Sequence, residues 1–445
     1  MTDQEQKTAA IFDIDGKTPA LARSLVVMFA MALIAMPAAQ AQTYSVIYNF
    51  TGGADGGGPE GGLTMDAAGN LYGTTAGYNQ PCGSQCGSVF KLKPTAQGWV
   101  FTPLYKFTGG SDGASPQGAV VFGPDGALYG TTTFGGSSCP SDNQYENGCG
   151  TVFRLTPQPN RCGTVLCPWR ETVLYRFAGG ATDGALPLSQ VAFDRAGNLY
   201  GTTFSGGAYT TNCYYGYNWC GTIFELTHSN GGWTETVPHI FTGGDDGANP
   251  IAGLTADAAG NFYGVAEANG AGGGGTLFEL TPYGSGWAEN TLYSFVSNSG
   301  GGYFPRGTLI FDAAGNLYGT TLYGGQYPNE GGTVFEMTPS GGGWDFTQLS
   351  SLPGFLQNGP LGGVVRDSAG NLYGTGSELG SGNTGIIFKL SPSNGGWTYT
   401  LLHQFSISDG DFPSGNLVLD AHGNLYGTAG GGGAHGWGVV WEITP

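Results

Sequence analysis

The 445-residue chain contains 85 glycines and 24 prolines, 13% aromatic residues and only 10% charged residues, with a formal net charge of −18. Its apolar and aromatic content is high enough to build a hydrophobic core, so the abundance of glycine and proline indicates a turn-rich all-β protein and not a disordered chain. An acidic, lysine-poor chain lacks the basic patches that attract nucleic acid or an anionic membrane surface, and both are excluded as expected partners.

The N-terminal residues have the pattern of a secretory signal peptide. Arg23 precedes an apolar run over residues 25–36, and the small-residue sequence Ala39-Gln40-Ala41 follows. Signal peptidase cleaves after such sequences, so we predict that residues 1–41 are removed and that the exported chain begins at Gln42. A retained membrane anchor is the alternative, although the run is short for a span. A start codon further downstream is a second alternative. After cleavage we expect no membrane span, and an extracellular or periplasmic location.

One phrase, first seen as DAAGNLYGTT at residues 66–75, occurs in seven copies along the chain. Each copy is followed by a phrase similar to GGTVFEMTP, and six copies then have a tryptophan before a third apolar phrase. Successive copies are 53 to 71 residues apart, a period that suits a four-stranded blade better than a helical repeat. The tyrosines of the first phrase are Tyr72, Tyr129, Tyr200, Tyr263, Tyr318, Tyr373 and Tyr426.

The phrases divide each repeat into four short strands, which we letter a to d in chain order. Strand a precedes the Asp-x-x-Gly-Asn turn, strand b is Leu-Tyr-Gly-Thr-Thr, strand c is the Val-Phe-x-Leu phrase, and strand d follows the tryptophan. The last repeat ends after strand c, whereas residues 44–50 form a strand d with no a, b or c before it. We therefore predict a seven-bladed β-propeller, one domain over residues 42–445, in which the N-terminal strand completes the C-terminal blade. A linear β-solenoid is the alternative.

The phrases DAAGNLYGTT, GGTVFEMTP and LYKFTGGSDGASP resemble the GloVer tandem repeat of the "choice-of-anchor" proteins over nearly all of residues 44–445. The GNLYGT core is also similar to the repeat of two-component-regulator propellers. The resemblance implies no established activity. The family name refers to variable C-terminal sorting tails, and because no tail follows the last strand c, we expect a freely secreted or periplasmic protein.

Eight cysteines fall in four close pairs, none with the Cys-x-x-Cys spacing. A zinc site is the alternative to disulfides, but none of the five histidines lies at ligand spacing from a cysteine pair. An even number of cysteines in an exported chain favours local disulfides, three of them in loops that join strand b to strand c. The expected pairs are Cys82 with Cys86, Cys139 with Cys149, Cys162 with Cys167, and Cys213 with Cys220.

In a four-stranded meander, the b-to-c and d-to-a connections lie on one face of the propeller, which we call the loop face. Its b-to-c loops vary in length and carry many aromatic residues, whereas the turns of the opposite face change little between repeats. Variable loops on a rigid scaffold are where binding residues usually lie, and aromatic rings suit stacking on sugars or burial against a protein. The alternative is that these rings pack on their own loops. The candidate ligand-binding residues are Tyr78, Tyr145, Tyr209, Tyr214, Tyr215, Tyr217, Trp219 and Tyr323.

Aspartates recur in the Asp-Gly turns of the same face. An aspartate that caps its own turn is the simpler interpretation, and a calcium site built from carboxylates and loop carbonyls is the alternative. The candidate residues are Asp55, Asp112, Asp183, Asp246 and Asp409.

A single catalytic site requires a difference between blades. The residue after the proline that opens strand a varies between repeats, and only Glu60 and Arg306 are charged there. Glu267 places a further carboxylate at the end of strand b in the fourth repeat. Two carboxylates set about 5–9 Å apart could hydrolyse a glycoside; ordinary solvated charges are the alternative.

From these observations we expect an exported, monomeric repeat protein that binds a polysaccharide, or an envelope or extracellular protein, through its loop face. No cofactor is expected, with calcium as the alternative. A carbohydrate-active hydrolase or lyase with carboxylates at the channel mouth is the second hypothesis. A structural surface module is the third.

Overall fold

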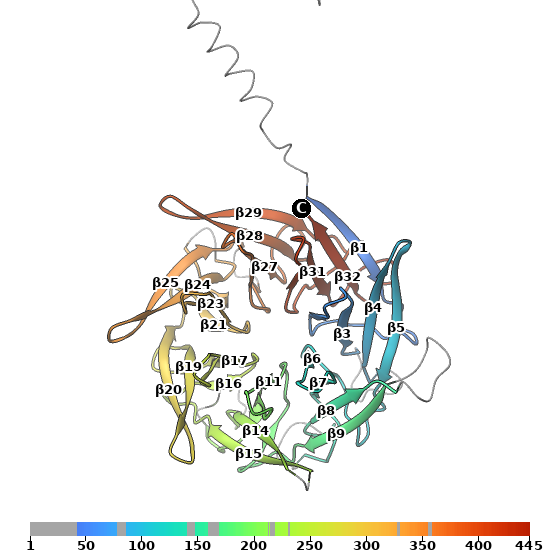
Figure 1. The fold of residues 1–445 in the computed structure, drawn as a ribbon. Helices are drawn as coiled ribbons and strands as arrows, with labels where there is room; N and C mark the ends of the chain where they lie inside the picture. Colours follow the sequence, from blue (N-terminus) through green and yellow to red (C-terminus); the bar gives the residue numbers. More distant parts are fainter. Residues whose placement is uncertain are drawn as a thin grey trace, which may run out of the picture. The chain divides into compact units, whose positions relative to one another are not determined.

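The computed structural model describes residues 42–77, 86–139, 147–158, 169–211, 213, 219–229, 232–326, 330–354 and 358–445. Every strand in these ranges belongs to one compact unit over Thr43–Thr444, and the described residues contain no helix. Seven antiparallel sheets stand around a central axis, which confirms the predicted seven-bladed β-propeller (Figure 1). Residues 1–41 lie outside the described ranges, so the signal peptide stays a prediction. The described part of the chain has no helix that is long and apolar enough to cross a membrane.

Each blade is a four-stranded meander whose strand a lies innermost and whose strand d lies outermost. Blade 1 consists of β2 (Leu63–Met65), β3 (Leu71–Thr75), β4 (Ser88–Thr95) and β5 (Gly98–Lys106). Blade 2 consists of β6 (Val121–Phe122), β7 (Leu128–Thr132), β8 (Thr151–Thr156) and β9 (Arg170–Arg176). Blade 3 consists of β11 (Ala192–Phe193), β12 (Leu199–Thr203), β14 (Thr222–Ser229) and β15 (Gly232–Ile240). Blade 4 consists of β17 (Thr255–Ala256), β18 (Phe262–Ala268), β19 (Gly273–Tyr283) and β20 (Gly286–Val296).

The remaining blades follow the same order. Blade 5 consists of β22 (Ile310–Phe311), β23 (Leu317–Tyr323), β24 (Thr333–Ser340) and β25 (Gly343–Ser351). Blade 6 consists of β26 (Val365–Arg366), β27 (Leu372–Gly376), β28 (Ile386–Ser393) and β29 (Gly396–Gln404). Blade 7 consists of β30 (Val418–Leu419), β31 (Leu425–Ala429), β32 (Val439–Thr444) and β1 (Thr43–Asn49). Short strands on the loop face extend the blades: β10 (Gly184–Ala185) pairs with β13 (Ser205–Gly206), β16 (Ala248–Pro250) with β18, and β21 (Tyr303–Pro305) with β23.

The N-terminal strand closes the ring, as the sequence predicts. Strand β1 pairs antiparallel with β32, with Tyr44 opposite Ile443 and Val46 opposite Trp441. Figure 1 shows the blue first strand lying against the red last strand. Blade 7 therefore combines the first strand of the domain with its last three strands. Because β1 pairs with β32, the last strand has a partner on both sides and the ring is closed.

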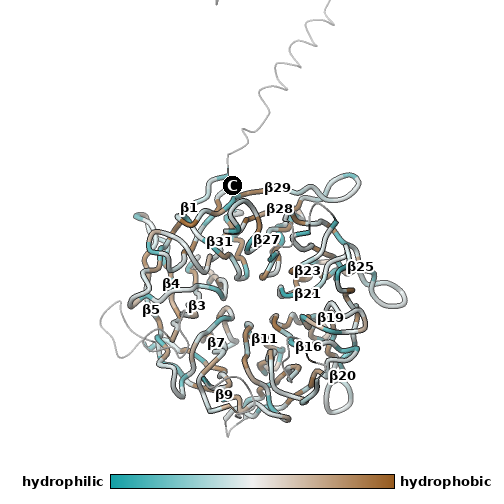
Figure 2. The backbone as a smooth tube through the Cα atoms, turned by 180° about the vertical axis from the view of Figure 1, so that it is seen from behind, coloured by the Kyte–Doolittle hydropathy of each residue, from teal (hydrophilic) through white to brown (hydrophobic). Residues whose placement is uncertain are grey.

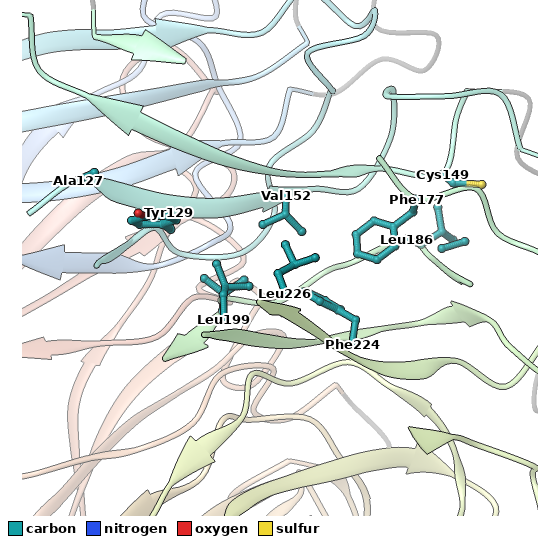
Figure 3. Close-up of a cluster of buried hydrophobic side chains, with 11 residues drawn as sticks. Ala127, Tyr129, Cys149, Val152, Phe177, Leu186, Leu199, Phe224 and Leu226 are labelled. Carbon is teal, nitrogen blue, oxygen red and sulfur yellow. The ribbon is translucent and has the colours of Figure 1, made fainter. Parts of the chain in front are cut away.

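The core lies between the blades and not at the centre of the ring. Seven clusters of buried apolar residues separate successive blades, and Figure 2 shows apolar segments spread around the whole ring. In the cluster between blades 2 and 3, Val152 and Phe177 face Leu199 and Phe224 (Figure 3). Each blade therefore needs its neighbours to bury its apolar faces.

The repeated Leu-Tyr-Gly phrase is explained by one close contact. Gly130 of β7 lies opposite Phe153 of β8, and a Cβ at Gly130 would lie only 2.7 Å from Phe153 Cζ. The ring of strand c thus lies directly on the backbone of strand b, a position that only glycine permits. The Asp-x-x-Gly-Asn turn is structural too: Asp66 accepts hydrogen bonds from Asn70 N (2.9 Å) and from the hydroxyl of Tyr72 (3.0 Å).

We expect closure to be required for folding. A chain that begins at Thr51 lacks β1 and leaves β32 as an open edge, whereas a chain that begins at Gln42 keeps it. The shorter chain should lose its cooperative thermal transition and aggregate, as measured by circular dichroism and size-exclusion chromatography with light scattering. A monomeric shorter chain with the melting temperature of the longer one would contradict this role of β1.

Two carboxylates on outer strands have strongly raised pKa values. Burial, followed by the charge of Asp112, raises the pKa of Glu171 in β9 to about 7. Burial, followed by the charge of Asp183, raises the pKa of Glu235 in β15 to about 7. A carboxyl whose pKa is higher in the folded than in the unfolded state stabilises the fold when protonated. This contribution is complete below about pH 4.3 and is lost as the pH rises through about 7.

The substitutions Glu171→Gln and Glu235→Gln should therefore raise the melting temperature at pH 8 by about 2 °C each, and should change it little at pH 4. Thermal unfolding at both pH values measures the difference. Asp345→Asn, at an exposed position of β25, is the control and should have no such effect. An equal gain at both pH values would show that charge burial is not the cause.

Candidate functional site: the channel mouth and the loop face

The cavity at the mouth of the central channel is small. The openings of all seven strand-a segments line a cavity of about 80 Å³, whereas ligand pockets usually enclose about 300–1,000 Å³. Glycines allow the inner segments to touch through their backbones: a Cβ at Gly118 would lie 2.4 Å from the carbonyl carbon of Ser189. Gln190 of blade 3 accepts a hydrogen bond from Asn416 of blade 7 (3.2 Å) across the channel. The cavity is therefore too small for a sugar ring.

The structure brings together two of the three predicted catalytic candidates. Glu267, at the end of β18, is fully buried, and Arg306 donates a hydrogen bond from Nε to Glu267 Oε1 (2.9 Å). Burial raises the pKa of Glu267, and the Arg306 guanidinium opposes this shift. The second carboxylate oxygen has no hydrogen-bond partner. The pair thus joins a fully buried carboxylate to a partly buried guanidinium across the junction of blades 4 and 5.

The third candidate, Glu60, lies at the mouth in blade 1 and has a different partner. Gln117 donates a hydrogen bond to Glu60 Oε2 (3.1 Å), and Gln117 Oε1 accepts one from Thr133 (2.9 Å). Burial raises the pKa of Glu60. Among the described residues no hydrogen bond or ion pair joins Glu60 to Glu267. Each carboxylate has its own polar partner. Glu60 of blade 1 is bound by Gln117 of blade 2, and Glu267 of blade 4 is bound by Arg306 of blade 5.

Sequence reasoning missed an acidic pair on the loop face between blades 6 and 7. Burial raises the pKa of Asp411, and the nearby charge of Glu378 adds to the shift. One oxygen of Asp411 is buried without a partner. The next residue, Phe412, has a φ of 55° and is 44% exposed. Its counterpart Leu186 adopts the same conformation but is buried. The sequence does show a bulky residue, Phe412, before the proline that opens strand a. It does not show that this residue has a positive φ.

The loop aromatics divide into exposed and buried residues. Tyr209 is 58% exposed and packs edge-to-face on Trp219, which is 7% exposed, with ring centroids 5.1 Å apart. Tyr323 is half-buried and donates a hydrogen bond to Asn358 Oδ1 (2.5 Å), so its hydroxyl is bound to a neighbouring segment of the protein. Of the described candidates, Tyr209 is the exposed one. Five others lie outside the described residues: Tyr78, Tyr145, Tyr214, Tyr215 and Tyr217.

Two predicted disulfides are confirmed, and both lie in b-to-c loops. The pairs are Cys139 with Cys149 and Cys213 with Cys220, with Cα atoms 5.2 and 5.1 Å apart. Cys86 is also disulfide-bonded, and its predicted partner Cys82 lies outside the described residues. Cys162 and Cys167 lie outside them as well. The bond between Cys213 and Cys220 ties down the segment that carries Trp219.

The aspartates of the Asp-Gly turns accept hydrogen bonds from their own turns. Asp55 accepts from Thr51 N (2.9 Å) and Thr51 Oγ1 (2.6 Å), and Asp112 and Asp246 make the same pair of contacts with Thr108 and Thr242. Asp183 and Asp409 also accept backbone hydrogen bonds within their turns. In the described ranges, no three His, Cys, Asp or Glu side chains gather as a metal site would require.

The ion pair of the buried Glu267 carboxylate with Arg306 predicts a large effect on stability. Arg306→Met leaves the Glu267 carboxylate buried without a counter-charge and should lower the free energy of unfolding at pH 7 by about 3–5 kcal/mol. The double variant with Glu267→Leu should recover most of this loss. Urea unfolding measures both. Arg154→Met is the control, because its ion pair with Asp125 is 36% exposed on each side and should contribute about 1 kcal/mol or less. If Arg306→Met lowered the free energy of unfolding by less than Arg154→Met does, the result would show that water reaches the Glu267 carboxylate.

The fold and its repeat define the class of protein: a closed propeller built from tandem repeats, each contributing one blade. The sequence pattern of the Gloeobacter/Verrucomicrobia repeat matches the chain twice, over residues 35–215 and 208–441. The chain therefore belongs to this repeat family. No curated protein matches its sequence.

Solved structures with a similar fold have low sequence identity. The extracellular domain of a proposed hybrid two-component system from B. thetaiotaomicron is 12% identical, covers 91% of this chain and is matched over 42% of its own length, with a TM-score of 0.50. A proposed oxidoreductase (glucose dehydrogenase) from Thermus thermophilus is 13% identical over 90% of this chain and 99% of that one, with a TM-score of 0.41. A Trichoderma reesei protein of carbohydrate-active enzyme family AA12 is 13% identical over 92% and 97%, with a TM-score of 0.42. These likenesses concern the fold.

Proposed function

We propose that the protein is an exported binding protein that holds a polysaccharide, or an envelope or extracellular protein, on its loop face. The observation that carries the proposal is the exposed ring of Tyr209. It stands on the buried Trp219, and the disulfide between Cys213 and Cys220 braces the same loop. An aromatic ring held rigidly at the surface can stack on a ligand with little loss of conformational freedom.

Export is supported by the disulfides, which form and persist in oxidising compartments. The structural likeness to an extracellular domain agrees with it. The signal peptide over residues 1–41 is part of this proposal.

A carbohydrate-active hydrolase or lyase is the second candidate. Glu60 favours it, because a carboxyl with a raised pKa at a cavity mouth suits a general acid. The small channel and the separate partners of Glu60 and Glu267 speak against it. We therefore rank binding first.

The test is incubation of the protein over residues 42–445 with a panel of polysaccharides, recording both retained protein and released sugar. We expect retention without release, and we expect Tyr209→Ala to weaken binding about tenfold. Tyr283→Ala is the matched control, because Tyr283 is 75% exposed but lies in a c-to-d turn on the opposite face.

The outcomes separate the candidates. Sugar release that Glu60→Gln abolishes would replace the binding proposal with the hydrolase or lyase. Retention that Tyr209→Ala and Tyr283→Ala reduce equally would reject the loop face as the site. If no polysaccharide is retained, the glycan ligand is rejected for the sugars tested, and a protein ligand becomes the hypothesis to pursue.

A further inference from the structure

The face opposite the loop face, which we call the turn face, has one equivalent position at every blade junction. This position is the last residue of strand a, which lies opposite the first residue of strand b. At the junctions where a ring contact is observed, its side chain packs on the strand-b tyrosine of the preceding blade. In blades 1 to 7 this position is occupied by Met65, Phe122, Phe193, Ala256, Phe311, Arg366 and Leu419.

Three junctions place a phenyl ring against that tyrosine. Phe122, Phe193 and Phe311 pack edge-to-face on Tyr72, Tyr129 and Tyr263, with ring centroids 5.0 to 5.2 Å apart. The contact fills the space between the blades with an apolar group.

The junction of blades 5 and 6 uses a cation instead. The Arg366 guanidinium lies over the ring of Tyr318, 6.0 Å from its centroid. The Tyr318 hydroxyl lies at hydrogen-bond distance from Glu336 Oε1 (2.8 Å) and Asp312 Oδ2 (3.1 Å). Trp397 of blade 6 packs against the apolar cluster that contains Tyr318. Arg366 thus lies over the ring of a tyrosine whose hydroxyl contacts two carboxylates, and a tyrosine face is a favourable setting for a guanidinium.

The junction of blades 7 and 1 repeats these groups but has no cation at the position of Arg366. The Tyr426 hydroxyl bonds to Asp420 Oδ2 (3.3 Å) and to Glu442, which lies opposite it in β32. Trp99 of blade 1 stands edge-to-face to Tyr426, with ring centroids 5.8 Å apart. Met65 occupies the position of Arg366, and it carries no charge.

A groove of about 770 Å³ lies at this junction, lined by Met65, Pro94, Trp99, Tyr426, Asp420 and His422 among others. Its volume is within the range of ligand sites. The acidic residues that line it are Asp66 and Asp420, and His422 approaches Asp420 to 3.7 Å. Glu442 does not line the groove, but its carboxylate contacts the hydroxyl of Tyr426, which does. The excess is negative, in a chain whose net charge is −18.

We propose that this groove binds an arginine side chain of a partner polypeptide, in the place that Arg366 fills at the junction of blades 5 and 6. The guanidinium would lie against Tyr426 and Trp99 and face the carboxylates of Asp420 and Glu442. Charge complementarity and the internal precedent of Arg366 determine the choice of occupant. The site is on the turn face, so it does not depend on the proposed loop-face function.

The experiment exchanges the two junctions. The probe is the peptide acetyl-Gly-Arg-Gly-amide, and the same peptide with citrulline in place of arginine is the uncharged control. The readout is the indole N–H signal of each tryptophan by NMR on the protein over residues 42–445 labelled with ¹⁵N-tryptophan. In the natural sequence we expect the Trp99 signal to shift saturably with the arginine peptide and to stay in place with the citrulline peptide.

Met65→Arg supplies an internal guanidinium and should weaken binding about tenfold or more, whereas Met65→Leu should leave it unchanged. Arg366→Met removes the internal cation at the other junction, so the Trp397 signal should then shift with the peptide as well. If Met65→Arg fails to fold, the Arg366→Met variant tests the same claim at a junction where Met65 is untouched.

Three results would overturn the proposal. The first is a Trp99 signal that does not move at millimolar arginine peptide. The second is an equal shift with the citrulline peptide. The third is an unchanged affinity in Met65→Arg together with no new shift of Trp397 in Arg366→Met, because binding to a generally acidic surface would behave in that way.

Discussion

The contact on which the propeller depends is the aromatic ring of strand c lying on the glycine of strand b. A Cβ on that glycine would come within 2.7 Å of the ring at Gly130 and within 2.3 Å at Gly427, where the ring is that of Trp441. The ring of strand c occupies the space that a side chain on the strand-b glycine would fill. It thereby forms part of the apolar face that packs against the next blade. Glycines of the inner segments bring the blades equally close at the axis, as Gly415 does against Gly62. The packing that builds the ring therefore also narrows the mouth of its channel.

Most of the fold could be predicted from the sequence because the residues that form the strands and turns of each blade recur within each repeat. The Asp66 to Gly73 phrase contains the turn, its cap and the glycine for the ring, and the unmatched strands at the two ends of the domain indicate closure through β1. The candidate site was less predictable, because contacts across a blade junction join residues from different repeats. The ion pair of Glu267 and Arg306 is one such contact. The left-handed conformation of Phe412 is another feature that composition and spacing do not encode.

Differences between repeats are where function is expected in such a protein, and they arise in two ways. The loop face differs by insertion, since the b-to-c loop of blade 3 carries Tyr209 and a disulfide. The turn face differs by single substitutions at a fixed position, since Met65 stands where other blades have Phe122 or Arg366. An insertion adds a new surface, whereas a substitution changes the group that packs at the blade junction and lines the groove there. The first can suit a large ligand and the second a single side chain.

These two surfaces lie on opposite faces of the ring, with Tyr209 in blade 3 and the groove at the junction of blades 7 and 1. Interblade cores, ring closure and hydrogen-bonded turns connect the blades between them. Coupling between two sites requires an element with two arrangements that both ligands bias, and the described sheets are seen in one arrangement. A ligand on the loop face and a cationic side chain on the turn face should therefore bind independently. The two proposed sites would then hold their ligands on opposite faces of the ring, and neither ligand would change the affinity for the other.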